Sequence, residues 1–268
     1  MPYADVGGDI RLFYTDDGSG EGPPLLLVHG WGTDSHQWSW HIDALTTAGR
    51  RVIAVDLRGH GYSSVPETGN TPRMMAEDLN VLLDRLAIPE AIPVGHSMGG
   101  QVVSILAVEH PERVRALVAL DPGYGITDDI ARGFPKMIAG LRGERPHAMA
   151  EAIDQWCTNA ATPAVLRRWH KRRLYGMPPH VLAQAFEAMF LEDGAIGLRP
   201  ATDDYLARRR CPVLSIWADQ ERANWEAGLL KDPASKVVCW EGSSHRLHEE
   251  RPAEFVHLLG GWLRSLRV

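Results

Sequence analysis

The residues best suited to chemistry are a serine, a histidine and several carboxylates, and each of them follows an apolar run. Ser97 lies between the apolar run 91–94 and the helix-forming stretch 101–110, with Gly95 and Gly99 on either side. This order predicts a strand, a tight turn and a helix. A side chain at either glycine would collide with the strand or the helix. The turn would hold the Ser97 hydroxyl above the sheet, where the start of the helix directs N–H groups at a bound anion.

A histidine downstream is the candidate base. His245 comes shortly after the apolar run 236–240, which predicts a further strand. A single histidine is more often structural, but this one follows Ser97 in chain order and lies at the same edge of the predicted sheet. We therefore expect His245 to take the proton of a reacting hydroxyl.

Three carboxylates compete to orient that histidine. Asp121 follows the apolar run 116–120, whereas Asp219 and Glu221 follow the run 212–217. A carboxylate at any of these strand ends could hold one ring nitrogen of the base and fix its tautomer. The residue pattern leaves the choice open, and Asp121 could equally be a turn cap before a proline.

The elements that must position these residues are predicted from hydrophobic periodicity. Continuous apolar runs such as 25–28 and 52–55 are typical of strands buried on both faces of a parallel sheet. Between the runs, leucines at three- and four-residue spacing in 75–86 predict a helix, and another is expected at 252–266. Strands that alternate with helices predict a mostly parallel, doubly wound α/β sheet, whose ligands bind at the carboxyl ends of the strands.

The alternation stops in one long segment. We expect residues 1–122 and 209–268 to form the core domain and residues 123–208 to form an inserted helical cap over Ser97. The basic run 167–173 is interpreted as a solvated helix face. The large apolar side chains of the cap are expected to line or support an apolar chamber: Phe134, Met137, Leu141, Trp156, Trp169, Met177, Phe186, Met189 and Phe190.

Composition excludes several classes of partner. A net charge of -6 and a pI near 6.0 argue against nucleic acid, which requires a basic face. The three cysteines are far apart and form no pair with metal-ligand spacing, so neither a disulfide framework nor a metal site is expected. No uncharged apolar run of about 18 residues occurs, and the first residues lack a basic flank with an apolar core. We expect a cytoplasmic protein that does not bind membranes.

Four motifs together resemble the α/β-hydrolase superfamily. They are Gly95-His96-Ser97-Met98-Gly99-Gly100, His29-Gly30-Trp31-Gly32, Asp56-x-Arg58-Gly59-x-Gly61-x-Ser63, and His245 ahead of Glu250-Arg251-Pro252. The resemblance covers nearly the whole chain outside the cap and implies an α/β-hydrolase fold. It also implies that Ser97 is the nucleophile, that His245 is the base, and that the backbone N–H groups of Trp31 and Met98 form an oxyanion hole.

A finer resemblance concerns the acid. Most superfamily members take it from the loop where Glu221 occurs here, but some take it from the end of the preceding strand, at Asp121. Asp121, the tryptophan at 31 and the cap sequence Asp154-Gln155-Trp156 resemble the cofactor-independent 3-hydroxy-4-quinolone and quinaldine 2,4-dioxygenases. Met98 departs from that branch, which has a histidine there, and the rest of the cap matches poorly.

The branch resemblance implies a ring-cleaving reaction that uses no cofactor and no metal. His245 and Asp121 would remove the 3-hydroxyl proton of a 2-alkyl-3-hydroxy-4(1H)-quinolone, and the anion would react with O2 to give carbon monoxide and an N-acylanthranilate. Ser97 would hydrogen-bond this small apolar aromatic substrate, and Trp156 would form a wall of its site.

The alternative is a serine hydrolase of the esterase or lactonase type, in which Ser97 attacks a carbonyl. A binding protein without turnover is a third class, and the intact Ser97 and His245 argue against it.

Overall fold

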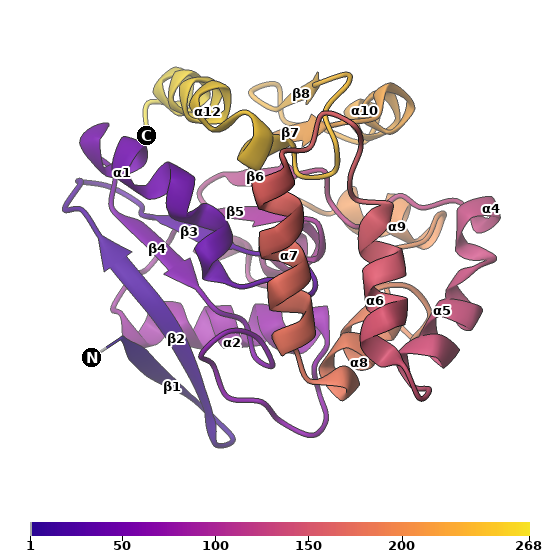
Figure 1. The fold of residues 1–268 in the computed structure, drawn as a ribbon. Helices are drawn as coiled ribbons and strands as arrows, with labels where there is room; N and C mark the ends of the chain where they lie inside the picture. Colours follow the sequence, from indigo (N-terminus) through magenta and orange to yellow (C-terminus); the bar gives the residue numbers. More distant parts are fainter. Residues whose placement is uncertain (1) are drawn as a thin grey trace.

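The computed structural model describes residues 2–268, and its centre is one eight-stranded sheet (Figure 1). The strand order is β1-β2-β4-β3-β5-β6-β7-β8. β1 pairs with β2 and β2 with β4 in antiparallel fashion, and all the other pairs are parallel. The strands are β1 (Tyr3–Gly7), β2 (Ile10–Asp17), β3 (Leu25–Val28), β4 (Val52–Val55), β5 (Ile92–His96), β6 (Leu117–Leu120), β7 (Val213–Trp217) and β8 (Lys236–Cys239). The predicted α/β-hydrolase fold, a mostly parallel doubly wound sheet, is confirmed.

The apolar runs form strands because each must fill two cores at once. In β3, Leu26 and Val28 belong to the core beneath α2 and α3, whereas Leu25 and Leu27 belong to the core beneath α1 and α12. Successive side chains of a strand point to opposite faces of the sheet, so a strand covered on both faces is apolar throughout. Strand β1 was not predicted, because three of its five residues, Ala4, Asp5 and Gly7, are of types with low strand propensity.

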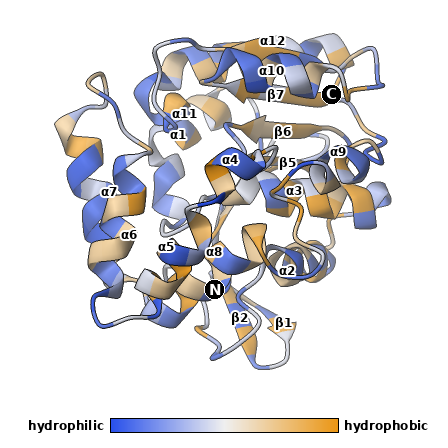
Figure 2. Cartoon of the chain, turned by 90° about the vertical axis from the view of Figure 1, so that its right-hand side faces the viewer, coloured by the Kyte–Doolittle hydropathy of each residue, from blue (hydrophilic) through white to orange (hydrophobic). Residues whose placement is uncertain are grey.

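Two helical layers cover the faces of the sheet, and Figure 2 marks their apolar sides by hydropathy. Helix α2 begins after Thr71, whose hydroxyl accepts the N–H of Met74 at 3.2 Å, and Pro72 occupies its first turn. The helices outside the segment between β6 and β7 are η1 (Ser35–Trp38), α1 (Ser39–Thr47), α2 (Pro72–Arg85), α3 (Met98–Glu109), η2 (Pro111–Arg113), α10 (Gln220–Ala227), α11 (Leu247–Glu250) and α12 (Pro252–Leu266).

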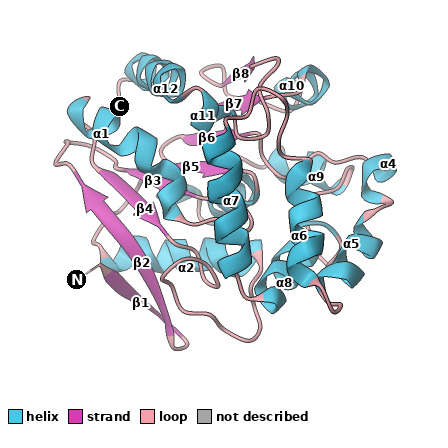
Figure 3. Cartoon of the chain, in the orientation of Figure 1, coloured by secondary structure: helices cyan, strands magenta, loops and turns pink. Residues whose placement is uncertain are grey.

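The segment between β6 and β7 consists of helices and loops (Figure 3). Its helices are α4 (Asp128–Ala131), α5 (Phe134–Leu141), α6 (Pro146–Gln155), α7 (Ala164–Gly176), α8 (Pro179–Phe190) and α9 (Ala201–Leu206). Side chains from α5, α6 and α8 line the same pocket as Ser97. The segment therefore reaches over the carboxyl ends of the strands, while its treatment as a separate cap domain at 123–208 stays a prediction.

Across residues 2–268, no helix combines the length and the apolar character that a bilayer span needs.

Candidate active site

Ser97 occupies the turn between β5 and α3 in a strained conformation. Its φ is 55° and its ψ is −118°, a region that a non-glycine residue adopts only where its surroundings enforce it. A Cβ at Gly95 would lie 2.2 Å from the carbonyl oxygen of Gly99, and one at Gly99 would lie 2.4 Å from that of Val28 in β3. The predicted collision with helix and strand is therefore the reason for both glycines.

His245 and Asp121 meet at the ends of two different strands. His245 Nδ1 lies 2.5 Å from Asp121 Oδ2, and the other carboxylate oxygen accepts the N–H of Ala218 at 3.1 Å. A carboxylate accepts hydrogen bonds, so the proton of the neutral ring is on Nδ1 and its Nε2 is left free to accept another proton. The structure thus brings together the predicted base and one of the three candidate acids.

Asp121 is held ionised by its neighbours. Burial raises the pKa of this carboxyl, but the hydrogen bond and charge of His245, together with the charge of Arg222, lower it below its usual value. Arg222 is fixed there because it donates to the carbonyls of Pro122 and Tyr124, at 3.1 and 2.5 Å. No local pattern indicates this role of Arg222, since it depends on where α10 packs.

The other two candidate acids, Asp219 and Glu221, lie at the start of α10. Asp219 caps α10, and its Oδ1 accepts the N–H of Arg222 at 2.8 Å. Glu221 is exposed in the first turn of the same helix. Within the described chain neither carboxylate hydrogen-bonds to His245. The physical reason is that only Ala218 and Asp219 separate β7 from α10, a connection too short to carry a carboxylate to the histidine.

The His29-Gly30-Trp31-Gly32 turn lies against Ser97. A Cβ on Gly30 would be 3.1 Å from the Cβ of Ser97. His29 donates from Nδ1 to the Gly30 carbonyl at 2.8 Å and accepts the N–H of Leu57 on Nε2 at 3.0 Å. Burial lowers the pKa of His29 to about 4, so the ring is neutral and can do both. His29 therefore fastens this turn to the Asp56–Ser63 motif rather than reaching the pocket.

The two N–H groups predicted to form an oxyanion hole are available. Within residues 2–268 no acceptor is found for the N–H of Trp31, and that of Met98 lies in the first turn of α3, where helical N–H groups lack an intrahelical partner. The indole of Trp31 donates to the carbonyl of Leu182 in α8 at 2.9 Å and packs against Phe186. This contact ties the oxyanion turn to the cap and was not predicted.

Ser97, Asp121 and His245 share a cavity of about 440 Å³. Of the apolar cap residues expected around it, Phe134, Trp156, Phe186, Met189 and Phe190 line it, and Met137, Leu141, Trp169 and Met177 do not. Trp156 is 66% exposed although it lines the cavity, so it lies at the rim.

A larger cavity, of about 670 Å³, lies elsewhere and contains none of the candidate catalytic residues. Arg173, Trp169 and Met177 line it. The expectation of a solvated basic face is wrong for Arg173, whose side chain is 10% exposed and whose Nε lies 3.0 Å from Asp34. Helix α7 turns this one member of the basic run inward while Arg167 and Arg168 stay exposed.

Comparison with known proteins agrees with this geometry. A family model described as the alpha/beta hydrolase fold matches residues 23–236. The chain belongs to this family. It is 43% identical over 98% of its length to an acetyltransferase component of the acetoin cleaving system of Pseudomonas putida, of which it covers 69%. It is 39% identical over 44% of its length to the bifunctional epoxide hydrolase 2 of Rattus norvegicus, and spans 22% of that protein.

Among solved structures, a thermophilic esterase from Thermogutta terrifontis superposes with a TM-score of 0.84. It is 25% identical, and the match covers 100% of this chain and 98% of the esterase. These relatives support an enzyme of the α/β-hydrolase family, and they lend no support to the dioxygenase branch.

Proposed function

We propose that this protein is a serine hydrolase of carboxylic esters or lactones. The observation that carries the proposal is the pair His245–Asp121, joined at 2.5 Å, in one cavity with Ser97. A serine on a strained turn, a histidine of fixed tautomer and a buried carboxylate are the parts that nucleophilic acyl transfer needs. This choice follows the hydrolase alternative of the sequence interpretation.

The reaction proceeds through an acyl-enzyme. His245 Nε2 accepts the proton of Ser97 as Oγ attacks the carbonyl carbon, and the oxyanion receives hydrogen bonds from the N–H groups of Trp31 and Met98. His245 then gives that proton to the departing alcohol. A water molecule, deprotonated by the same nitrogen, attacks the acyl-enzyme, and the carboxylic acid leaves with Ser97 restored.

The cavity favours esters with an apolar acyl or alkyl group. Phe134, Phe186 and Phe190 lie in edge or tilted contact with one another and form one wall, with Met189 beside them. Such a wall gains free energy by covering apolar substrate surface and offers few groups to a charged one.

The names of the relatives support acyl or hydrolytic chemistry. One is an esterase and another an epoxide hydrolase, and the acetyltransferase component is named for transfer of an acyl group. An acyl-enzyme on Ser97 is compatible with either water or another acceptor.

The dioxygenase remains a second candidate because the acid lies at the end of β6, as the resemblance to that branch implies. The His245–Asp121 pair would then deprotonate a 3-hydroxy-4-quinolone directly, and Ser97 would position the substrate. The two candidates differ in their need for Ser97 and in their consumption of O2.

Ser97→Ala separates them. Assayed on p-nitrophenyl esters, this variant should lose about 10⁴- to 10⁶-fold in kcat, because a hydrolase cannot spare its nucleophile. Ser104→Ala, a buried serine further along α3, is the matched control and should retain near-normal turnover.

An oxygen electrode and carbon monoxide detection with a 2-alkyl-3-hydroxy-4-quinolone complete the experiment. Oxygen uptake that survives Ser97→Ala but fails in His245→Ala, with no esterase in the wild type, would replace the hydrolase by the dioxygenase.

A further inference from the structure

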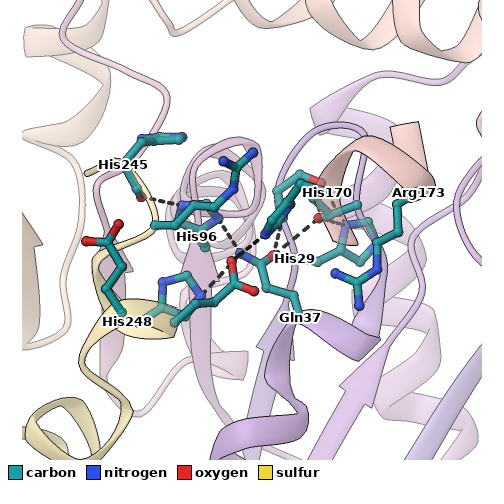
Figure 4. Close-up of polar contacts among 12 residues, drawn as sticks. His29, Gln37, His96, His170, Arg173, His245 and His248 are labelled. Carbon is teal, nitrogen blue, oxygen red and sulfur yellow. Dashed lines mark hydrogen bonds and ion pairs between the residues drawn. The ribbon is translucent and has the colours of Figure 1, made fainter. Parts of the chain in front are cut away.

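Gln37 is a fully buried amide that touches three parts of the candidate site at once (Figure 4). It lies in η1, outside every motif that the sequence singled out, and it lines neither cavity described above. Its side chain contacts Gly30 in the oxyanion turn, His96, which precedes the nucleophile, and His248 in the segment that follows His245.

The orientation of this amide is fixed by a group that can only donate. The backbone N–H of Gly30 donates to Gln37 Oε1 at 3.2 Å, and the hydroxyl of Thr33 lies 3.2 Å from the same atom. Because a backbone N–H cannot accept a hydrogen bond, the amide oxygen must face Gly30. The amide nitrogen therefore faces the opposite way, toward His96 and His248.

The amide nitrogen in turn fixes the proton on His96. Gln37 Nε2 lies 2.7 Å from His96 Nδ1 and 3.2 Å from His248 Nε2. An amide nitrogen only donates, so His96 Nδ1 must accept and the proton of the neutral ring must be on Nε2. That Nε2 lies 2.8 Å from the carbonyl oxygen of His245 and donates to it.

His96 is neutral in this arrangement. Burial, followed by the charge of His245, lowers its pKa well below the usual value. A second proton, on Nδ1, would also point at the N–H of Gln37. A continuous chain of hydrogen bonds thus results. The Gly30 N–H donates to Gln37, Gln37 donates to His96, and His96 donates to the backbone carbonyl of His245.

We propose that Gln37 is a positioning residue that sets the His96 tautomer. Through these hydrogen bonds it holds the oxyanion turn, the nucleophile turn and the His245 segment in a fixed arrangement relative to one another. This inference rests on the proposed function for its catalytic consequence. His245 is then held at two points, at its carbonyl by His96 and at its ring by Asp121. The precision of such supports decides how well the reacting atoms are aligned.

Two substitutions of similar shape separate hydrogen-bond direction from packing. Gln37→Glu keeps the outline of the side chain and places a carboxyl near Glu249, which lies 3.5 Å from Gln37 Nε2. At a pH at which the new carboxyl is ionised it cannot donate, so His96 must place a proton on Nδ1. A neutral His96 would then turn a lone pair toward the His245 carbonyl. Gln37→Met removes every hydrogen bond of the Gln37 side chain and leaves the tautomer of His96 unconstrained.

Nitrogen-15 NMR of histidine-labelled protein reads the tautomer without any substrate. In the wild type the His96 signals, assigned by comparison with His96→Gln, should show a proton on Nε2. They should show one on Nδ1 in Gln37→Glu and a mixture in Gln37→Met. Thr33→Val is the matched control, because it removes a hydroxyl from the same amide oxygen but keeps Gly30 as the donor; its tautomer should match the wild type.

Two further readings test the positioning role. The His245 Nδ1 proton in its hydrogen bond to Asp121 should give a strongly deshielded signal that shifts or broadens in Gln37→Glu and not in Thr33→Val. On p-nitrophenyl esters, Gln37→Glu should lower kcat about 10- to 100-fold with little change in KM, because misplacement of the reacting groups affects the transition state most.

Two results would overturn the positioning role of Gln37, and a third would overturn only the proposed function. A wild-type His96 that carries its proton on Nδ1 would overturn the inference even if no variant folds. So would a reversed tautomer in Gln37→Glu that leaves both the His245 signal and kcat unchanged. If the wild type hydrolyses no ester but the tautomers and the His245 signal behave as expected, the proposed function fails while the positioning role stands.

Discussion

Two buried carboxylates, Glu226 and Asp121, lie near the end of β7. They differ in whether their hydrogen-bond partners can still exchange a proton. Glu226 in α10 accepts hydrogen bonds from Tyr124, Arg209 and Trp217 at 2.7 to 2.9 Å, and from the hydroxyl of Ser215. Its side chain is fully buried and lines neither of the two cavities described above. Every lone-pair direction of Glu226 is therefore occupied by a fixed donor.

Asp121 is almost as buried, but one of its two hydrogen-bond partners, His245, can still exchange a proton. It accepts from Ala218 and His245, and the ring of His245 has a second nitrogen on the same cavity as Ser97. A saturated carboxylate can hold a fold together, whereas a catalytic one needs a partner that can still exchange a proton. Burial and charge alone do not distinguish the catalytic carboxylate from the structural one. The distinguishing feature of Asp121 is that its partner, His245, has a second ring nitrogen that can exchange a proton.

Substitution of Asp121 tests whether its hydrogen bond to His245 supports catalysis. Asp121→Asn should lower kcat for ester hydrolysis about 10⁴-fold, because a neutral amide can stabilise the wrong tautomer of His245 and cannot balance its charge. Steady-state kinetics on p-nitrophenyl esters would measure this. Asp219→Asn, which alters a helix cap beside the same cavity, should cost at most a few fold, and an equal loss in both variants would contradict the assignment.

The saturated carboxylate should show the opposite profile. Glu226→Gln leaves the buried Arg209 without its ion partner, which should lower the free energy of unfolding by about 3–5 kcal/mol. Urea denaturation followed by fluorescence would measure this loss. The folded fraction should keep near-normal kcat. Asp16→Asn, which breaks a partly exposed pair with Arg51, should cost about 1 kcal/mol or less.

The pH dependence of stability reports the charge of Asp121 in the folded protein. The folded pKa of Asp121 lies below its ordinary value of 3.8, so its ionisation stabilises the fold above about pH 4, and this contribution disappears as the pH falls through the folded pKa. The difference in unfolding free energy between wild type and Asp121→Asn should therefore shrink between pH 5 and pH 2. A difference that widens over that range would mean that burial dominates and the pKa is raised.

The smallest effect concerns the rim of the cavity. Trp156→Ala removes partly exposed apolar surface, so KM for long-chain esters should rise about threefold to tenfold, corresponding to about 1 kcal/mol, while kcat stays unchanged. Trp40→Ala, an exposed tryptophan that stacks on Trp169 outside this cavity, is the control. An effect that does not grow with chain length would place Trp156 outside the substrate site.

Local sequence patterns predicted the features that depend on neighbours along the chain. Apolar runs such as 25–28 predicted strands, because four consecutive apolar residues need burial on both faces. The glycines around Ser97 predicted its turn, because the collisions they avoid involve the strand and helix that this turn joins. The positions of His245 and the three carboxylates at strand ends followed from the same local patterns.

Which of these residues come into contact depends on packing between segments that are far apart in the chain. Asp121 and His245 are separated by 124 positions, and their contact depends on β6 and β8 flanking β7 in the sheet and on α10 starting too early for Glu221 to compete. Gln37 and Arg173 gave no local sign of burial, because an amide in a short helix and an arginine in a basic run are ordinarily solvated. Long-range packing fixes such contacts, and its free energy is shared over many residues, so no short pattern contains it.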